Sequence, residues 1–181
     1  MGIAHLLGRL RPVNPALRGF IEGCEDKPQP CWYGLVPGVT TPAELEQIQA
    51  EKLNQVISEL STNNCVVPFS FFENVLYRIR IKPCNITIGD LIQILGTPQL
   101  FTYTCSGRFL YAFHDFIGAS SRPYWDSPYS KILGFTVTSV PSHLLQLADE
   151  SDTYQWMSFR PRRAYEQAQP DVYCMDTNYE E

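Results

Sequence analysis

The chain has 181 residues, of which 44% are hydrophobic and 18% are charged, and its formal net charge is -5. This length predicts one domain or two small halves that share a core. The acidic balance argues against nucleic-acid binding, which needs concentrated Lys and Arg, and no apolar run reaches the roughly 20 residues that span a bilayer.

Residues 1–38 are predicted to form an extended N-terminal arm, because five prolines interrupt any regular pattern. Trp32 and Tyr33 are the expected anchors of this arm in the core. The first ten residues lack a cleavage site and a long apolar stretch, so no signal peptide is predicted as written. Their Ile and Leu residues at helical spacing fit either a short helix packed on the domain or a membrane-surface anchor.

A helix is predicted to begin after Thr41. Thr41 can cap it, Pro42 suits the first helical position, and Glu44 completes a capping box. Residues 61–64 end it. The apolar stripe that packs on the core consists of Leu45, Ile48, Leu53, Val56, Ile57 and Leu60.

Two strands are predicted next, over 65–72 and 75–81, joined at Glu73–Asn74. In the second strand apolar and basic residues alternate, which predicts one buried face and one basic face. The basic face is either a solvated strand face or an anion site. The alternating residues are Tyr77, Ile79 and Ile81 on the first face and Arg78, Arg80 and Lys82 on the second.

A second capped helix is predicted from Thr87, with Asp90 at capping-box spacing and Gly96 and Pro98 as stop signals. Strands are predicted after it over 100–105 and 108–113, joined by a Ser-Gly turn.

The remaining chain is predicted to contain a loop over 118–129, a strand over 131–140 and a short helical stretch to Leu147. Residues 148–181 are predicted to form a polar, poorly structured C-terminal tail.

The six cysteines are even in number and show no C-x-x-C spacing, which argues against a zinc site and favours disulfides formed in an oxidising compartment. Buried free thiols in a cytosolic protein are the alternative. A local bridge between Cys24 and Cys31 would close a polar, proline-containing loop. The disulfide candidates are Cys24, Cys31, Cys65, Cys84, Cys105 and Cys174.

The two helix starts resemble each other, since TPAELEQI (41–48) and TIGDLIQI (87–94) share Thr, Leu, Gln and Ile at equal positions. This similarity predicts an α+β domain over 39–147, built from a tandem α-β-β repeat (39–84 and 85–147) that forms an antiparallel sheet. The alternative is that two capped helices converged by chance.

The segment ITIGDLIQILGTP (86–98) resembles the helix signature of the small outer-membrane assembly lipoproteins and of the tandem-repeat β-lactamase-inhibitory proteins. The segment CWYGLVPGVTT (31–41), with the later IGD, also resembles an uncharacterised bacterial family of small exported proteins. These resemblances imply a non-enzymatic, extracytoplasmic module that presents a sheet surface to another protein.

Candidate catalytic chemistry is sparse. His114 with Asp115 is the one adjacent acid–base pair, and Cys105, Ser120 and Ser121 are the candidate nucleophiles beside it, but no G-x-S-x-G elbow is present. A solvated histidine at a strand end is the competing interpretation. Paired carboxylates and a phosphate loop are not indicated, and no catalytic residue, cofactor or metal is predicted.

Two groups of residues are candidates for binding a partner. Tyr124, Trp125 and Tyr129 form an aromatic loop between prolines, which is either a recognition loop or core filling. The basic residues Arg160, Arg162 and Arg163 lie beside Trp156 and Phe159 and would contact acidic lipid or a partner.

The sequence therefore predicts a non-enzymatic protein-binding or assembly module outside the cytoplasm, secreted or at a membrane surface. Its partner is another protein, and no small-molecule substrate is evident. The alternatives are an accessory structural subunit of a membrane-associated complex and a small hydrolase that uses His114 as base.

Overall fold

The helices are α2 (Pro15–Arg18), α3 (Pro42–Ile48), the π-helical segment η1 (Gln49–Leu53), α4 (Asn54–Thr62) and α5 (Ile88–Leu95). The strands are β1 (Phe69–Phe72), β2 (Val75–Ile81), β3 (Leu100–Tyr103), β4 (Phe109–Phe113), β5 (Ile117–Ser121), β6 (Ile132–Thr138) and β7 (Tyr154–Gln155). The computed structural model describes residues 13–62, 64–82, 84–103, 109–113, 117–121, 129, 131–139 and 154–155.

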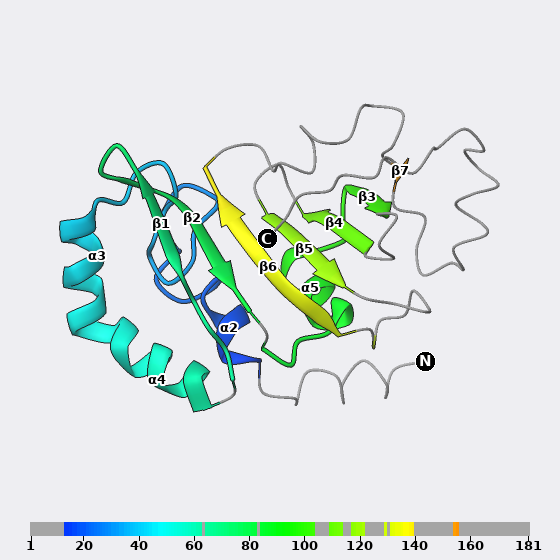
Figure 1. Ribbon diagram of the computed structural model, residues 1–181, viewed down its shortest axis with the longest axis horizontal. Coiled ribbons are helices and arrows are strands. Elements are labelled where there is room, and N and C mark those ends of the chain that lie inside the picture. Colours follow the sequence, from blue (N-terminus) through cyan, green and yellow to red (C-terminus); the bar gives the residue numbers. More distant parts are fainter. Residues whose placement is uncertain are drawn as a thin grey trace, which may run out of the picture.

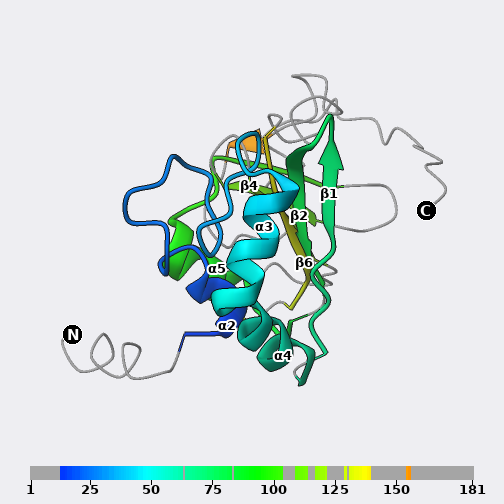
Figure 2. The same cartoon turned by 90° about the vertical axis from the view of Figure 1, so that its left-hand side faces the viewer.

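The strands form one antiparallel sheet in the order β1-β2-β6-β5-β4-β3-β7 (Figure 1). The helices lie on one side of this sheet (Figure 2), which we call the helix side; the opposite side is the outer face. The predicted α+β class is confirmed. No described helix is both long and apolar enough to cross a membrane.

Both predicted capping boxes are present and fix where the two main helices begin. The Thr41 hydroxyl accepts from the Glu44 N–H at 3.4 Å, and the Glu44 carboxylate accepts from the Thr41 N–H at 2.8 Å. The equivalent distances for Thr87 and Asp90 are 3.2 Å and 2.9 Å. Gly96 follows α5 with a φ of 82°, a conformation that glycine adopts without steric cost.

The core lies between the sheet and the helix side. Two rows of apolar side chains cross β2, β6, β5 and β4 in register, and each of these side chains is at most 3% exposed. The first row consists of Ile79, Val137, Ile117 and Phe113, and the second of Ile81, Phe135, Ala119 and Tyr111. The predicted burial of Ile79 and Ile81 in β2 is confirmed.

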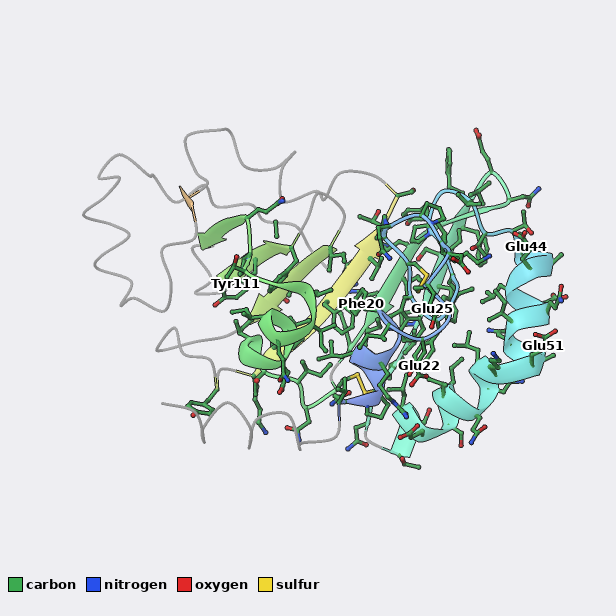
Figure 3. All side chains as sticks on the ribbon, turned by 180° about the vertical axis from the view of Figure 1, so that it is seen from behind. Phe20, Glu22, Glu25, Glu44, Glu51 and Tyr111 are labelled. Atoms are coloured by element: carbon green, nitrogen blue, oxygen red, sulfur yellow. A yellow bond between two sulfur atoms is a disulfide. The ribbon has the colours of Figure 1, made fainter. Side chains whose placement is uncertain are left out.

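The segment 13–38 belongs to this core, which differs from the predicted surface arm. Leu17, Trp32 and Leu35 are completely or almost completely buried, and the Trp32 indole donates to the Ala16 carbonyl at 2.8 Å. Seen from behind, this segment and α2 lie in front of the strands (Figure 3). Burial of Trp32 confirms its predicted role as an anchor, and Tyr33 packs against the same core.

Two further predictions are corrected by the sheet. Residues 118–121, predicted as loop, belong to strand β5, which pairs with both β4 and β6. Tyr154–Gln155, predicted as part of the poorly structured tail, form β7 against β3. The predicted turn at 106–107 and the predicted helical stretch to Leu147 lie outside the described residues.

The hairpins β1-β2 and β3-β4 lie toward opposite ends of the sheet, and in each the first strand is the outer one. The internal repeat and the domain boundaries at 38, 84 and 147 stay predictions.

Candidate functional site

A β-bulge in β2 determines which side chains reach the outer face. Ser70 lies opposite Arg78 and Phe71 lies opposite Leu76, so Tyr77 is the extra residue of β2. Leu76 is buried, as is Ile79, whereas Tyr77 is only half-buried. The predicted grouping of Tyr77 with Ile79 and Ile81 on one buried face is therefore wrong at Tyr77.

Arg78 is held against Tyr77 on the outer face. The guanidinium carbon of Arg78 lies 5.2 Å from the centroid of the Tyr77 ring, within the range of a cation–π contact. The Nε atom of Arg78 is buried and has no hydrogen-bond partner. This single N–H is withdrawn from water without an acceptor, and an unsatisfied buried donor costs free energy.

Strand β1 forms one edge of the sheet and exposes aromatic side chains. Phe72 is 67% exposed and Phe71 is 36% exposed, and Val66, just before the strand, is 61% exposed. Figure 2 looks onto β1, and no helix lies in front of it. Exposed apolar edge strands are templates for pairing with another chain.

The hydrogen bonds between β1 and β2 show which backbone groups of β1 face the edge. Val66 and Lys82 exchange two backbone bonds, and Arg80 donates to the Pro68 carbonyl at 3.1 Å. Bonded positions alternate along an antiparallel strand. The N–H and C=O groups of Phe69 and Phe71 therefore point away from β2, toward the open edge.

Two arginines of β2 form a basic strip on the outer face of the sheet. The labelled residues Glu22, Glu25, Glu44 and Glu51 lie on the helix side (Figure 3). The outer side of β2 carries Arg78 and the exposed Arg80. This basic strip lies next to β1, the edge strand of the described sheet.

A second polar cluster joins α2 to α4. Arg18 Nη2 lies 2.6 Å from Glu59 Oε2, and the Tyr33 hydroxyl donates to the Pro15 carbonyl at 2.6 Å. Burial raises the pKa of Tyr33 to about 12, although the Arg18 guanidinium acts in the opposite direction. Arg18 Nε is buried without a hydrogen-bond partner, but the guanidinium pairs with Glu59 through Nη2. We therefore interpret this cluster as one that holds α2 against α4.

Among the described residues, Cys24 and Cys31 form a disulfide, as expected for a local bridge, and Cys65 and Cys84 form another. The second joins the end of α4 to the residues after β2, across the Val66–Lys82 pair. Cys105 and Cys174 lie outside the described residues.

The other predicted site residues are only partly placed. Tyr129 is 85% exposed, and Ser120 lies half-buried on β5. The remaining candidates fall outside the part of the chain that the structure describes; they are Tyr124, Trp125, His114, Asp115, Arg160, Arg162 and Arg163.

Among the residues with a described position, no group of three or more His, Cys, Asp or Glu side chains is arranged to hold a metal ion. Comparison with protein-family models, with curated proteins and with solved structures finds no match for this chain. The candidate site is therefore argued from the edge strand β1 and the basic strip of β2 alone.

Proposed function

We propose that this protein is a non-enzymatic binding module that works outside the cytoplasm and binds an extended segment of another protein at β1. The observation that carries the proposal is the exposed, uncharged edge strand Phe69–Phe72 with its outward backbone groups. An added strand satisfies those backbone groups, and pockets or exposed side chains at alternate positions give specificity.

The composition of β1 favours a binding role over a protected edge. Proteins block exposed edges with charged residues, particularly lysine, with proline or with bulges that twist the edge away. The four residues of β1 contain no charge and no proline, and Pro68 and Glu73 stand only at its two ends. The bulge lies in β2, so β1 itself keeps an unbroken template.

The extracytoplasmic part of the proposal is supported by the two disulfides. Disulfides persist in secreted and periplasmic proteins and are rare in the cytosol, where thiols are kept reduced. The resemblance of the segment 31–41 to small exported proteins points to the same compartment.

The binding role is tested by selecting ten-residue peptides from a random display library on the disulfide-bonded protein. Phe71→Pro removes an outward N–H from the edge, and Phe72→Glu introduces a negative charge on β1. Both are expected to lower the affinity of selected peptides at least tenfold. Ile21→Glu is the matched control, because Ile21 is also an exposed apolar residue but does not belong to the sheet.

Hydrogen exchange gives an independent readout of strand addition. The amides of Phe69 and Phe71 are expected to become protected when a selected peptide is bound, because they then donate to it. Peptides that bind all variants equally and leave both amides unprotected would contradict the proposal.

A further inference from the structure

We infer that the segment that binds at β1 carries an acidic side chain opposite Ser70, and that its carboxylate pairs with Arg78. This inference rests on the proposed binding function of β1 and names the chemistry of the partner. It starts from Arg78, whose Nε atom is buried without an acceptor and whose guanidinium lies over the Tyr77 ring. A carboxylate accepts two parallel hydrogen bonds from a guanidinium.

The geometry of the sheet brings such a carboxylate within reach of Arg78. Ser70 lies directly opposite Arg78, and neighbouring strands are about 4.8 Å apart. A residue that faces Ser70 from an added strand therefore has its Cα about 10 Å from that of Arg78. A long arginine side chain and a glutamate side chain span this distance together, and the small Ser70 side chain leaves the space between them open.

The preformed position of Arg78 favours this pairing. The Tyr77 ring holds the guanidinium at 5.2 Å, so less side-chain freedom is lost when an acid binds. The bulge is what places Tyr77 and Arg78 on the same face of β2. The neighbouring Arg80 is exposed on the same strip and adds to its positive potential.

Charge complementarity selects a foreign acidic segment over a second copy of this chain. Two β1 strands paired antiparallel place only Ser70 and Phe72 of each copy on the outer face of the joint. Such a pair would bring two basic strips together and supply no carboxylate opposite Ser70. The labelled Glu44 of α3 and Glu51 of η1 lie on the helix side (Figure 3).

The remaining positions of the partner segment follow from the exposed side chains of β1. In the partner segment, the residue directly after or before the acid faces Phe71 on the helix side. The next residue, two places from the acid, faces Phe72 on the outer face. Cross-strand pairs that involve an aromatic residue favour aromatic or β-branched partners. We therefore expect an alternating apolar strand interrupted by one acidic residue.

The test uses two synthetic nine-residue peptides of alternating Thr and Val, one with Glu and one with Gln at the centre. Affinities are measured by fluorescence anisotropy against the full, disulfide-bonded chain. The Glu peptide is expected to bind about tenfold more tightly than the Gln peptide. This ratio is expected to fall to about one in Arg78→Met and to stay unchanged in Lys52→Met, which removes an equal charge on the helix side.

A second variant keeps the inference testable if Arg78→Met does not fold. Ser70→Glu places a carboxylate within the chain beside Arg78, so it is expected to abolish the preference for the Glu peptide while the Gln peptide still binds. Thermal unfolding identifies variants that are folded.

The outcomes separate this inference from the proposed function. Equal affinities for the two peptides, both lost in Phe71→Pro, would overturn the acidic partner and leave β1 as the binding edge. If neither peptide binds, both the inference of an acidic partner and the proposed binding at β1 are overturned. A dimer that sedimentation detects in wild type and that Phe71→Pro abolishes would show that a second copy occupies the edge, which also overturns the inference.

Discussion

Tyr77 and Ile79 lie on opposite faces of β2 although they are only two residues apart. The extra residue at Tyr77 shifts the register beside Ser70, so Ile79 is buried in the core while the Tyr77 ring meets Arg78 on the outer face. In a regular strand both side chains would lie on one face. The bulge therefore assembles the aromatic and basic pair that we place at the centre of the binding surface.

This arrangement predicts unequal costs for two similar truncations. Ile79→Ala is expected to lower the free energy of unfolding by about 2–5 kcal/mol, because it leaves a cavity in the core. Tyr77→Ala is expected to cost less than about 1.5 kcal/mol, since it removes a half-buried ring and one cation–π contact. Urea denaturation measures both values, and equal losses would contradict the bulged register.

The sequence of β2 shows why its strand was predictable and its bulge was not. Alternation of apolar and basic residues over 77–82 is a strong strand signal. This alternation contains no information about the neighbouring strand β1, whereas a bulge depends on the register between two strands. Glu73 and Asn74, with φ values of 49° and 62°, form the predicted turn, but they do not reveal the shift four residues later.

The two described disulfides predict four cysteines that do not react as thiols in the oxidised protein. After purification without reductant and denaturation, a thiol reagent is expected not to react with the four bonded cysteines, Cys24, Cys31, Cys65 and Cys84. Peptide mapping by mass spectrometry is expected to recover the pairs Cys24–Cys31 and Cys65–Cys84. Six reactive thiols in protein from its native compartment would contradict the proposed extracytoplasmic location.

The same bonds are expected to contribute unequally to stability. Their sequence separations are 7 and 19 residues, and a longer closed loop removes more freedom from the unfolded chain. On that basis loss of Cys65–Cys84 costs about 3 kcal/mol and loss of Cys24–Cys31 about 2.5 kcal/mol. Paired Cys→Ala variants compared by denaturation measure the order, and a larger loss from the shorter loop would argue against the entropic origin.

Tyr33 predicts a loss of stability at alkaline pH. Burial raises its pKa to about 12 in the folded protein, whereas the unfolded chain ionises near the ordinary value of 10. The contribution of the neutral Tyr33 hydroxyl to the free energy of unfolding is thus complete below pH 10. It disappears as the pH rises toward 12, because the unfolded state ionises first. Denaturation midpoints between pH 9 and 12 measure this slope, and Tyr33→Phe is expected to reduce it.

Strand β5 shows the limit of reading this chain locally. Ile117–Ser121 has the sequence IGASS, and Gly, Ala and Ser are weak strand formers, so a loop was the natural prediction. Its small residues fit because β4 and β6 pair with it on both sides. The edge position of β1 has the same origin, since the order of strands in a sheet is set by tertiary contacts. The sequence therefore indicated a basic strand but not the open edge beside it.

The capping box of α5 predicts a local and moderate loss of stability. Thr87→Ala removes the hydroxyl that accepts from the Asp90 N–H, which is expected to lower the free energy of unfolding by about 1 kcal/mol. Thr87→Ser keeps an acceptor and is the matched control. Equal stability of the Ala and Ser variants would show that this cap contributes nothing.

The capping box of α3 predicts a shift in one carboxyl titration. Hydrogen bonds from the Thr41 N–H and hydroxyl hold the pKa of Glu44 below its usual value. A lowered pKa in the folded state means that the ionised cap stabilises above the ordinary glutamate pKa, and that this contribution disappears as the pH falls through the lowered pKa. Carboxyl carbon shifts followed by NMR between pH 2 and 7 measure it. Thr41→Ala is expected to return the pKa of Glu44 toward its ordinary value. Thr87 caps a different helix, so Thr87→Ala is expected to leave the pKa of Glu44 unchanged.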